Sequence, residues 1–212
     1  MNKVTMNVQE GLGKIKLLEK RYEKQLNEGD FVCATKDSDT KIMGTDAKDW
    51  QTNQKARYDS LIDISNEIEA IKRALNQSNA QTKVKIGGKE YTVAEAIYMK
   101  QNGISYKKML LKKLKENFER INMFIQSRNE QALKAAENFV IQMYGNKEAV
   151  SKSETSTDEM NSYYNQHKYD MCDSISILDK IKSLENEIDE FETEVDNALS
   201  VSNATTLIEV EF

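Results

Sequence analysis

Apolar residues recur along much of this chain at alternating steps of three and four positions, which places them on one stripe of an α-helix. The clearest run is Leu61, Ile64, Ile68, Ile71 and Leu75. It predicts a helix over about 52–77, and similar stripes predict helices over 8–28, 92–145 and 173–203. Such steps are typical of helices that pack side by side at a shallow angle. The chain is therefore expected to be mainly α, an antiparallel bundle of about four long helices.

Two extended segments interrupt this helical pattern. Residues 83–92 form two short runs around Gly87 and Gly88, a pair that can take the positive φ of a tight turn, so we predict a β-hairpin there. Thr92 and Glu95 then make a T-x-x-E capping box at the start of the third helix. The tail, residues 207–212, alternates apolar and acidic positions, and this extended tail could add an edge strand to the hairpin.

Two further segments lack helical periodicity. Residues 30–48 are punctuated by Gly44 and by several Asp, Ser and Thr residues, which indicates a loop or a small hairpin. Residues 146–164 are rich in Ser, Thr, Lys and Glu and are predicted to form a polar, solvated loop. Asn102 and Gly103 interrupt the third helix and indicate a kink or a break. With these interruptions, we expect residues 1–212 to form a single helical domain.

The composition agrees with long helices and excludes several functions. The 212 residues include no proline and only 8 glycines, the two residue types that most disfavour helix interiors. The net charge is -5 and basic residues are mixed with acidic ones, so the concentrated positive face that binds duplex nucleic acid is missing. No apolar run is long enough for a membrane span, and the first residues lack the apolar core of a signal peptide.

Cysteine usage bears on the compartment. Cys33 and Cys172 lie far apart in polar surroundings, without the spacing of a metal site. Because disulfides are rare in reducing compartments, we expect two free thiols and a cytoplasmic protein, in the host cytoplasm if a phage encodes it.

A short polar sequence motif occurs twice in the chain. Ser78 to Thr82 and Ser202 to Thr206 both read S-N-A-x-T, each at the end of a striped helix and before an extended segment. Asn, Ser and Thr suit helix ends, so one interpretation is a pair of matched helix stops. The alternative is a site where two polar helix ends offer amide and hydroxyl groups to a small polar ligand. The candidate ligand-binding residues are Asn76, Asn79, Thr82, Asn203, Thr205, Thr206, Arg73 and Tyr58.

In these residues the chain resembles the septicolysin-like family, a group of helical proteins from bacteria and some phages. The resemblance lies in Lys16 to Leu26, in Ile71 to Val84 with the T-V-A-E-A stretch that follows, and in Asn203 to Thr206. It covers both ends of the chain and its second quarter. The chain departs from the family pattern at Ala204 and Gln77, where an aromatic residue and an arginine are common, and it has a longer middle. The resemblance implies a helical, oligomeric protein with no agreed enzymatic activity.

Candidate catalytic groups are scarce. His167 is the only histidine, which leaves no His-rich metal site and removes the usual nucleophile–histidine arrangements unless it serves alone. No phosphate-binding glycine motif occurs, because Gly87-Gly88-Lys89 is too short. We therefore expect no enzyme, no cofactor and no metal. A looser set of stacking and cationic residues could clamp a nucleotide-like ligand if the fold brought it together: Trp50, Arg57, Tyr58, Arg73, Arg128, Tyr163 and Tyr164.

Two functions remain open. The first is a non-enzymatic homo-oligomeric binding protein, in its sharpest form a phage-type sponge that sequesters a small nucleotide-derived immune signal at sites between subunits. The second is a structural or assembly protein, such as a virion component, a scaffold or a toxin-like oligomer, with no small ligand. Narrow apolar stripes leave unburied edges on a single copy, so both hypotheses expect a homo-oligomer.

Overall fold

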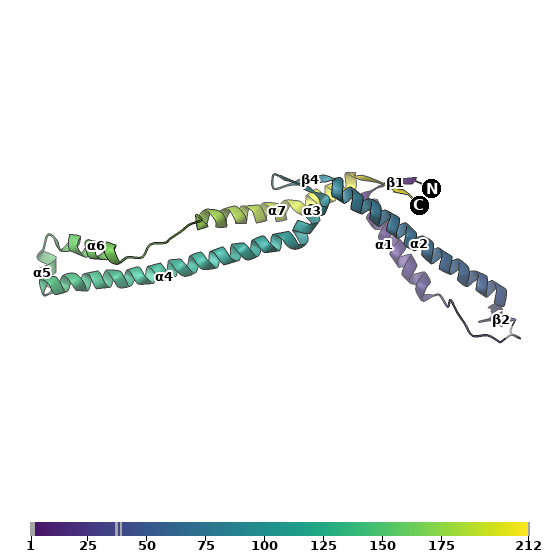
Figure 1. The fold of residues 1–212 in the computed structure, drawn as a ribbon, viewed down its shortest axis with the longest axis horizontal. Helices are drawn as coiled ribbons and strands as arrows, with labels where there is room; N and C mark the ends of the chain where they lie inside the picture. The colour runs from purple at the N-terminus through teal and green to yellow at the C-terminus, as the bar shows by residue number, and fades with distance from the viewer. Residues whose placement is uncertain (1–2, 37, 39, 212) are drawn as a thin grey trace. The chain divides into compact units, whose positions relative to one another are not determined.

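The computed structural model describes residues 3–36, 38 and 40–211. The protein is mainly α with small two-stranded sheets, which confirms the predicted fold class (Figure 1). Its contacts group the chain into two compact units where we expected one domain. The first comprises residues 1–102 and 190–212, and the second residues 103–189.

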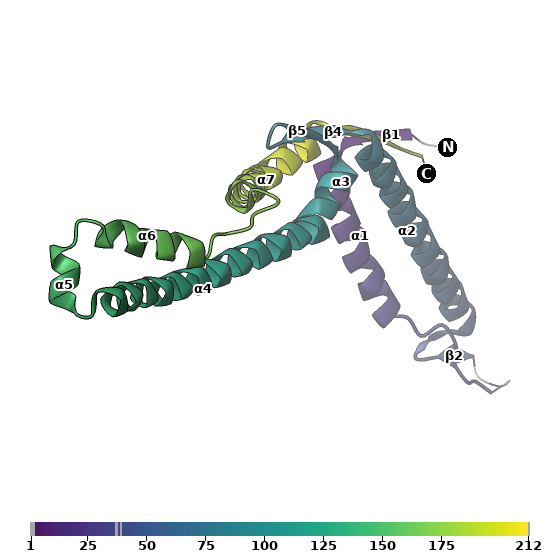
Figure 2. The same cartoon turned by 60° about the vertical axis from the view of Figure 1, so that its left-hand side comes forward.

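In the first unit, helices α1 (Val8–Asn27) and α2 (Ala47–Gln81) lie side by side as an antiparallel pair in both ribbon views (Figures 1 and 2). Their seam buries Ile15, Leu18, Ile64, Ile71 and Leu75, with Ile71 at 0% exposure. Because the stripe on each helix is narrow, apolar side chains outside the seam remain exposed. The predicted heptad stripe thus forms the seam of a two-helix pair.

Two short sheets cover the end of this unit. Strands β4 (Lys83–Ile86) and β5 (Lys89–Thr92) form the predicted hairpin, with Gly87 and Gly88 at φ 54° and 72° in its turn. The second sheet joins the two ends of the chain: β1 (Lys3–Asn7) pairs antiparallel with β6 (Leu207–Glu211). The tail is therefore a strand as expected, but the expected pairing with residues 83–92 is wrong. Phe212 lies outside the described residues.

The tail pairs with β1 because its apolar side chains complete the α1–α2 core. Ile208 and Val210 are 3% and 1% exposed and belong to the same cluster as Met6, Val8 and Ile71. We did not predict β1, because Lys3 to Asn7 alternates polar and apolar residues over only five positions. The burial of Ile208 and Val210 favours this register, because a shift by one residue would turn both side chains to solvent.

The two S-N-A-x-T segments adopt the same structure. In each, the threonine amide donates to the serine carbonyl, at 2.8 Å for Thr82 and 2.9 Å for Thr206. The threonine carbonyl then accepts the amide of the first residue of another helix, Val93 at 2.9 Å and Val8 at 3.0 Å. Both of those helices begin with a capping box, Thr92 with Glu95 and Asn7 with Glu10. The first unit therefore contains an internal repeat.

Each copy of the repeat is a helix, a strand, a second strand and a helix. One copy runs continuously through α2, β4, β5 and α3 (Val93–Tyr98). The other runs from α7 (Ile177–Thr205) into β6 and resumes at the start of the chain with β1 and α1. Both helices extend past the predicted ends at 77 and 203, so S-N-A lies in the last helical turn and only the final threonine lies beyond it. The bond from threonine to serine carbonyl continues the helical pattern to that point.

The remaining segments of the first unit connect these elements. Between α1 and α2, β2 (Lys41–Ile42) pairs with β3 (Thr45–Asp46) within the segment 30–48, of which residues 37 and 39 lie outside the described part. The side chain of Asp46 accepts the Lys48 amide at 2.9 Å and caps α2. After α3, the π-helical segment η1 (Met99–Gly103) includes the predicted interruption at Asn102 and Gly103, and the helix continues through it.

The second unit is built on the long helix α4 (Ile104–Tyr144). The segment predicted to be a polar loop over 146–164 is instead mostly helical, with α5 (Lys147–Lys152) and α6 (Ser156–His167). The side chain of Asn146 caps α5 by accepting the Ala149 amide at 2.8 Å. Helix α6 packs on α4, where Tyr163 stacks on Phe139 with ring centroids 4.7 Å apart. Tertiary packing therefore decides the structure of a segment whose composition favours a loop.

The repeat predicts that the protein tolerates circular permutation, in which the two present ends are joined and new ends are made in the β4–β5 turn. A circular permutant would join Phe212 to Met1 through a short glycine linker and begin at Gly88. The permutation would turn the β6–β1 pairing into a hairpin and would open the β4–β5 turn, so that the two copies exchange roles. We therefore expect a cooperative unfolding transition with a free energy within about 2 kcal/mol of the parent, measured by urea denaturation. A permutant opened between Ile71 and Lys72 is the control and should not fold, since it cuts the buried seam. Failure of the first permutant to fold would contradict the repeat.

Candidate functional site

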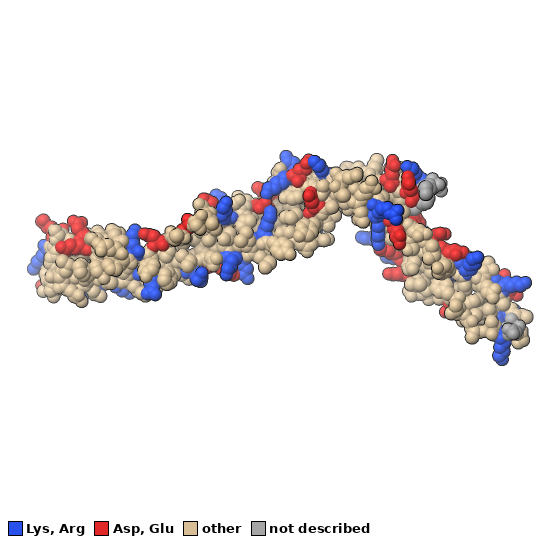
Figure 3. All heavy atoms as spheres, in the orientation of Figure 1, with Lys and Arg blue, Asp and Glu red and all other residues tan. Residues whose placement is uncertain are grey.

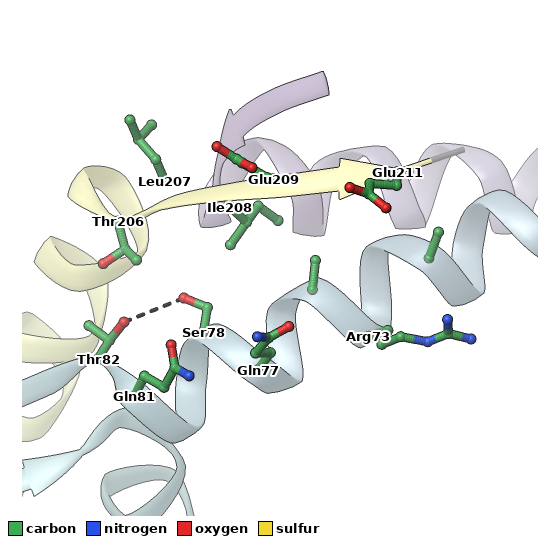
Figure 4. A pocket seen from close by; sticks show the side chains of 12 residues that line it. Arg73, Gln77, Ser78, Gln81, Thr82, Thr206, Leu207, Ile208, Glu209 and Glu211 are labelled. Carbon is green, nitrogen blue, oxygen red and sulfur yellow. Dashed lines mark hydrogen bonds between the residues drawn. The ribbon is translucent and has the colours of Figure 1, made fainter. Parts of the chain in front are cut away.

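The first candidate site is a groove between α2 and β6, here called the α2 groove. Its volume is about 550 Å³. Figure 4 shows β6 running beside α2, with the hydroxyls of Ser78 and Thr82 in contact at 3.4 Å. The helix side of the groove is lined by Ala70, Arg73, Ala74, Gln77, Ser78, Gln81 and Thr82, and the strand side by Thr206, Leu207, Ile208, Glu209 and Glu211.

A second groove lies between α7 and β4, here called the α7 groove. Its volume is about 590 Å³. The hydroxyls of Ser202 and Thr206 are again 3.4 Å apart. Near its far end, Glu194 accepts the Gly87 amide at 2.7 Å. The groove is lined by Glu194, Asn197, Ala198, Val201, Ser202, Thr205 and Thr206 on the helix side, and by Thr82, Lys83, Val84 and Lys85 on the strand side.

The two grooves are counterparts in the repeat. When Ser78 is aligned with Ser202, every helix residue that lines the α2 groove falls on a residue that lines the α7 groove. Ala74 and Ala198 correspond, as do Thr82 and Thr206. These two threonines line both grooves, so the grooves meet where the two S-N-A-x-T segments end. Each groove joins the helix of one copy of the repeat to the strand of the other.

The grooves differ in charge. On the strand side, Glu209 and Glu211 line the α2 groove, whereas Lys83 and Lys85 line the α7 groove. Glu209 and Lys85 occupy equivalent positions in the repeat, two residues after the strand begins. The two sites therefore share a backbone, but their strands present opposite charges.

Ion pairs within each sheet hold two of these charges in place. Lys83 bonds Glu90 at 2.7 Å, and this contact raises the pKa of Lys83. Glu211 bonds Lys3 at 2.7 Å, which lowers the pKa of the Glu211 carboxyl. All four side chains are exposed, so each pair contributes little to stability. Their effect is to hold the charged groups of Lys83 and Glu211 close to their own sheets.

Both strands have an unpaired edge along their groove. In antiparallel pairs, neighbouring residues point their backbone groups alternately toward the partner strand and away from it. The Val8 amide donates to the Thr206 carbonyl, so the backbone amides and carbonyls of Ile208 and Val210 point toward β1. Those of Leu207, Glu209 and Glu211 point away from β1. By the same rule, the backbone amides and carbonyls of Lys83 and Lys85 point away from β5. Because each sheet described here has two strands, these outward groups have no third strand to bond.

The candidate residues from the sequence are only partly brought together. Arg73, Thr82 and Thr206 line the α2 groove, and Thr82, Thr205 and Thr206 line the α7 groove. The three asparagines, Asn76, Asn79 and Asn203, line neither groove, because the helix continues past them and turns them to other faces. Tyr58 lies more than five turns before the end of α2, beside a separate hollow lined by Phe31 and Trp50.

Of the stacking and cationic residues, the structure brings two together in the second unit. Arg128 and Tyr163 line a hollow of about 220 Å³ with His167 and Tyr169. The His167 ring is exposed and stacks on Tyr163 with centroids 4.1 Å apart, and its Nδ1 lies 2.8 Å from the Tyr163 carbonyl oxygen. Both contacts lie within the last turn of α6. Trp50, Arg57, Tyr58 and Arg73 belong to the first unit and do not line this hollow.

Charge and metal-ligand patterns in the described residues give no other site. Figure 3 shows basic and acidic side chains interspersed over the visible face. No group of three or more His, Cys, Asp or Glu residues in the described part of the chain could hold a metal ion. No helix among the described residues is long and apolar enough to cross a membrane. Cys33 and Cys172 are both free thiols.

Comparisons of this chain with protein-family models, with curated proteins and with solved structures find no match. The resemblance to the septicolysin-like family therefore stays a prediction from the sequence.

The capping box of Thr92 and Glu95 predicts a pH dependence. The Thr92 amide and hydroxyl both donate to Glu95, at 2.7 and 3.0 Å, and lower the pKa of the Glu95 carboxyl. A lowered folded-state pKa means that this contribution to stability is present above the unfolded pKa and is lost as pH falls through the folded one. Titration of the Glu95 side-chain carbon by NMR should show a pKa below the usual value of about 4.3. Thr92→Val should bring it closer to that value, and an unchanged pKa would contradict the assignment.

Proposed function

We propose that this chain is a non-enzymatic structural protein that assembles through the two grooves of its first unit. The observation that carries the proposal is the pair of unpaired strand edges, one along each groove and both set by the same repeat. A free strand edge with an open groove beside it accepts a further strand through backbone hydrogen bonds. This favours the assembly hypothesis from the sequence over the small-ligand hypothesis.

The form of the grooves supports this choice. Sites for small molecules are usually concave, enclose most of the ligand and are lined mainly by apolar side chains. Here most of the lining side chains are polar, and Arg73, Gln77, Gln81 and Glu209 are exposed. Exposed apolar residues on α1 and α2, such as Leu17 and Tyr58, give a further reason for self-association.

Light scattering after size exclusion, over a range of protein concentrations, tests the assembly. We expect a mass that rises with concentration to multiples of 24.3 kDa. Glu209→Pro should weaken association about tenfold, because proline removes the outward amide but leaves the pairing with β1 intact. Glu209→Ala keeps that amide and is the matched control for the lost side chain. A mass of 24.3 kDa at every concentration would contradict self-assembly.

A second function has one observation in its favour. Lys83 and Lys85 line the α7 groove together with the hydroxyls of Ser202, Thr205 and Thr206. Cations and hydroxyls are the groups that bind the phosphates of a nucleotide-derived molecule. The groove could therefore serve a sponge for such a signal, with three of the candidate residues, Thr82, Thr205 and Thr206, in contact with the ligand.

Calorimetry with cyclic dinucleotides and with ADP-ribose tests this second function. If it holds, Lys85→Ala should lower the affinity about tenfold, the loss typical of a bond to a charged group. Glu209→Ala, at the equivalent position of the other groove, should leave the affinity unchanged. Absence of binding heat with every one of these ligands would exclude the sponge.

A further inference from the structure

The two strand edges are complementary to each other. After the exposed Leu207, the outward side chains on β6 are acidic, at Glu209 and Glu211, and those on β4 are basic, at Lys83 and Lys85. Inward side chains on both strands are apolar and buried, at Ile208 and Val210 and at Val84 and Ile86. Each strand thus has the same alternation, with opposite charge on the solvent side.

One register satisfies both the backbone and the side chains. In antiparallel pairing, residues that form two backbone bonds must both point outward from their own sheets. Glu209 and Lys85 meet this condition and can lie opposite each other. The same register places Glu211 opposite Lys83, and Ile208 and Val210 opposite Ile86 and Val84. Two opposite-charge pairs then lie on the solvent face and two apolar pairs on the core face.

We propose that β6 of one copy of this chain pairs with β4 of a second copy in this antiparallel register. The pairing would join two sheets into one of four strands, in the order β1, β6, β4, β5. This inference rests on the proposed assembly function and names its partner, a second copy, and its contact.

Charge selects this pairing over the symmetric one. If β6 paired with β6 of a second copy, glutamates would face glutamates, and pairing of β4 with β4 would bring lysines together. Like charges directly opposite are destabilising in a sheet. The favoured contact is therefore heterologous, with a different edge from each copy.

The helix sides of the grooves leave room for this contact. Ala70, Ala74 and Ser78 line the α2 groove, and Ala198 and Ser202 line the α7 groove. Small side chains let a helix from a second copy approach closely. Because every chain carries one edge of each kind, the contact repeats head to tail and gives either a closed ring or an open filament.

Charge reversal at the two equivalent positions tests the proposal. Glu209→Lys and Lys85→Glu each replace an opposite-charge pair by a like-charge pair, so each variant alone should self-associate about tenfold more weakly than the parent. An equimolar mixture of the two should regain association, since the Lys85 edge of one then faces the Glu209 edge of the other. The double variant Glu209→Lys/Lys85→Glu should also regain it. Sedimentation velocity of the full chain measures all four samples.

Matched controls separate a local from a general effect of charge. Glu23→Lys and Lys20→Glu make the same changes in net charge on exposed positions of α1, outside both grooves, and should leave association unchanged. Circular dichroism should show that every variant keeps the parent helix content. Recovery in the mixture excludes misfolding as the cause of the single-variant losses.

The outcomes distinguish this contact from the broader function. If the parent associates and both single variants associate equally well, the β6–β4 contact is wrong while the assembly function stands. If the singles weaken but neither the mixture nor the double variant recovers, the register is wrong. If the parent is monomeric at all concentrations, both proposals fail.

Discussion

The first unit depends on the pairing of β1 with β6, which ties the two ends of the described chain together. This pairing places Ile208 and Val210 over Ile71 and Leu75 and so closes the core between α1 and α2. It also starts α1, because the Thr206 carbonyl takes the Val8 amide and Asn7 becomes the N-terminal cap. Without it, two helices would share only a narrow seam, and an isolated helix pair buries too little apolar surface to be stable alone.

The same junction is used twice, and its two copies differ in the charge of their outward strand residues. Serine, threonine and the capping residues fix the backbone in both copies. The outward strand residues make no contribution to either core, so they are free to differ, and they carry opposite charges at Glu209 and Lys85. Under the proposed assembly, the duplicated backbone would supply both halves of one interface.

Much of the fold could be predicted from the sequence because the seams are strictly periodic. Leu61 to Leu75 predicted α2, the paired glycines predicted the hairpin, and Thr92 with Glu95 predicted the start of α3. Helices α5 and α6 were missed, since packing against α4 outweighs their polar composition. The tail's partner was also missed, because strand pairing depends on a segment at the other end of the chain. One signal was available: Asn7 and Glu10 repeat the spacing of Thr92 and Glu95.

The sequence predicted the region of the candidate site but not all of the residues that line it. The S-N-A-x-T text marked the region where both grooves meet, and its threonines line them. Its asparagines do not, because a helix that continues by one turn rotates them away from the groove. No motif marks the charged strand residues. Glu209 and Lys85 can be recognised as candidate contact residues only once the structure shows which strand edges are unpaired.

Amide hydrogen exchange, measured residue by residue by NMR, tests the repeated junction most directly. The account predicts that Val8 and Ile208 exchange as slowly as their counterparts Val93 and Val84, because each pair of amides is held by the same bonds in the two copies. Exchange of Val8 and Ile208 at rates close to those of a free chain, while Val93 and Val84 stay protected, would contradict it.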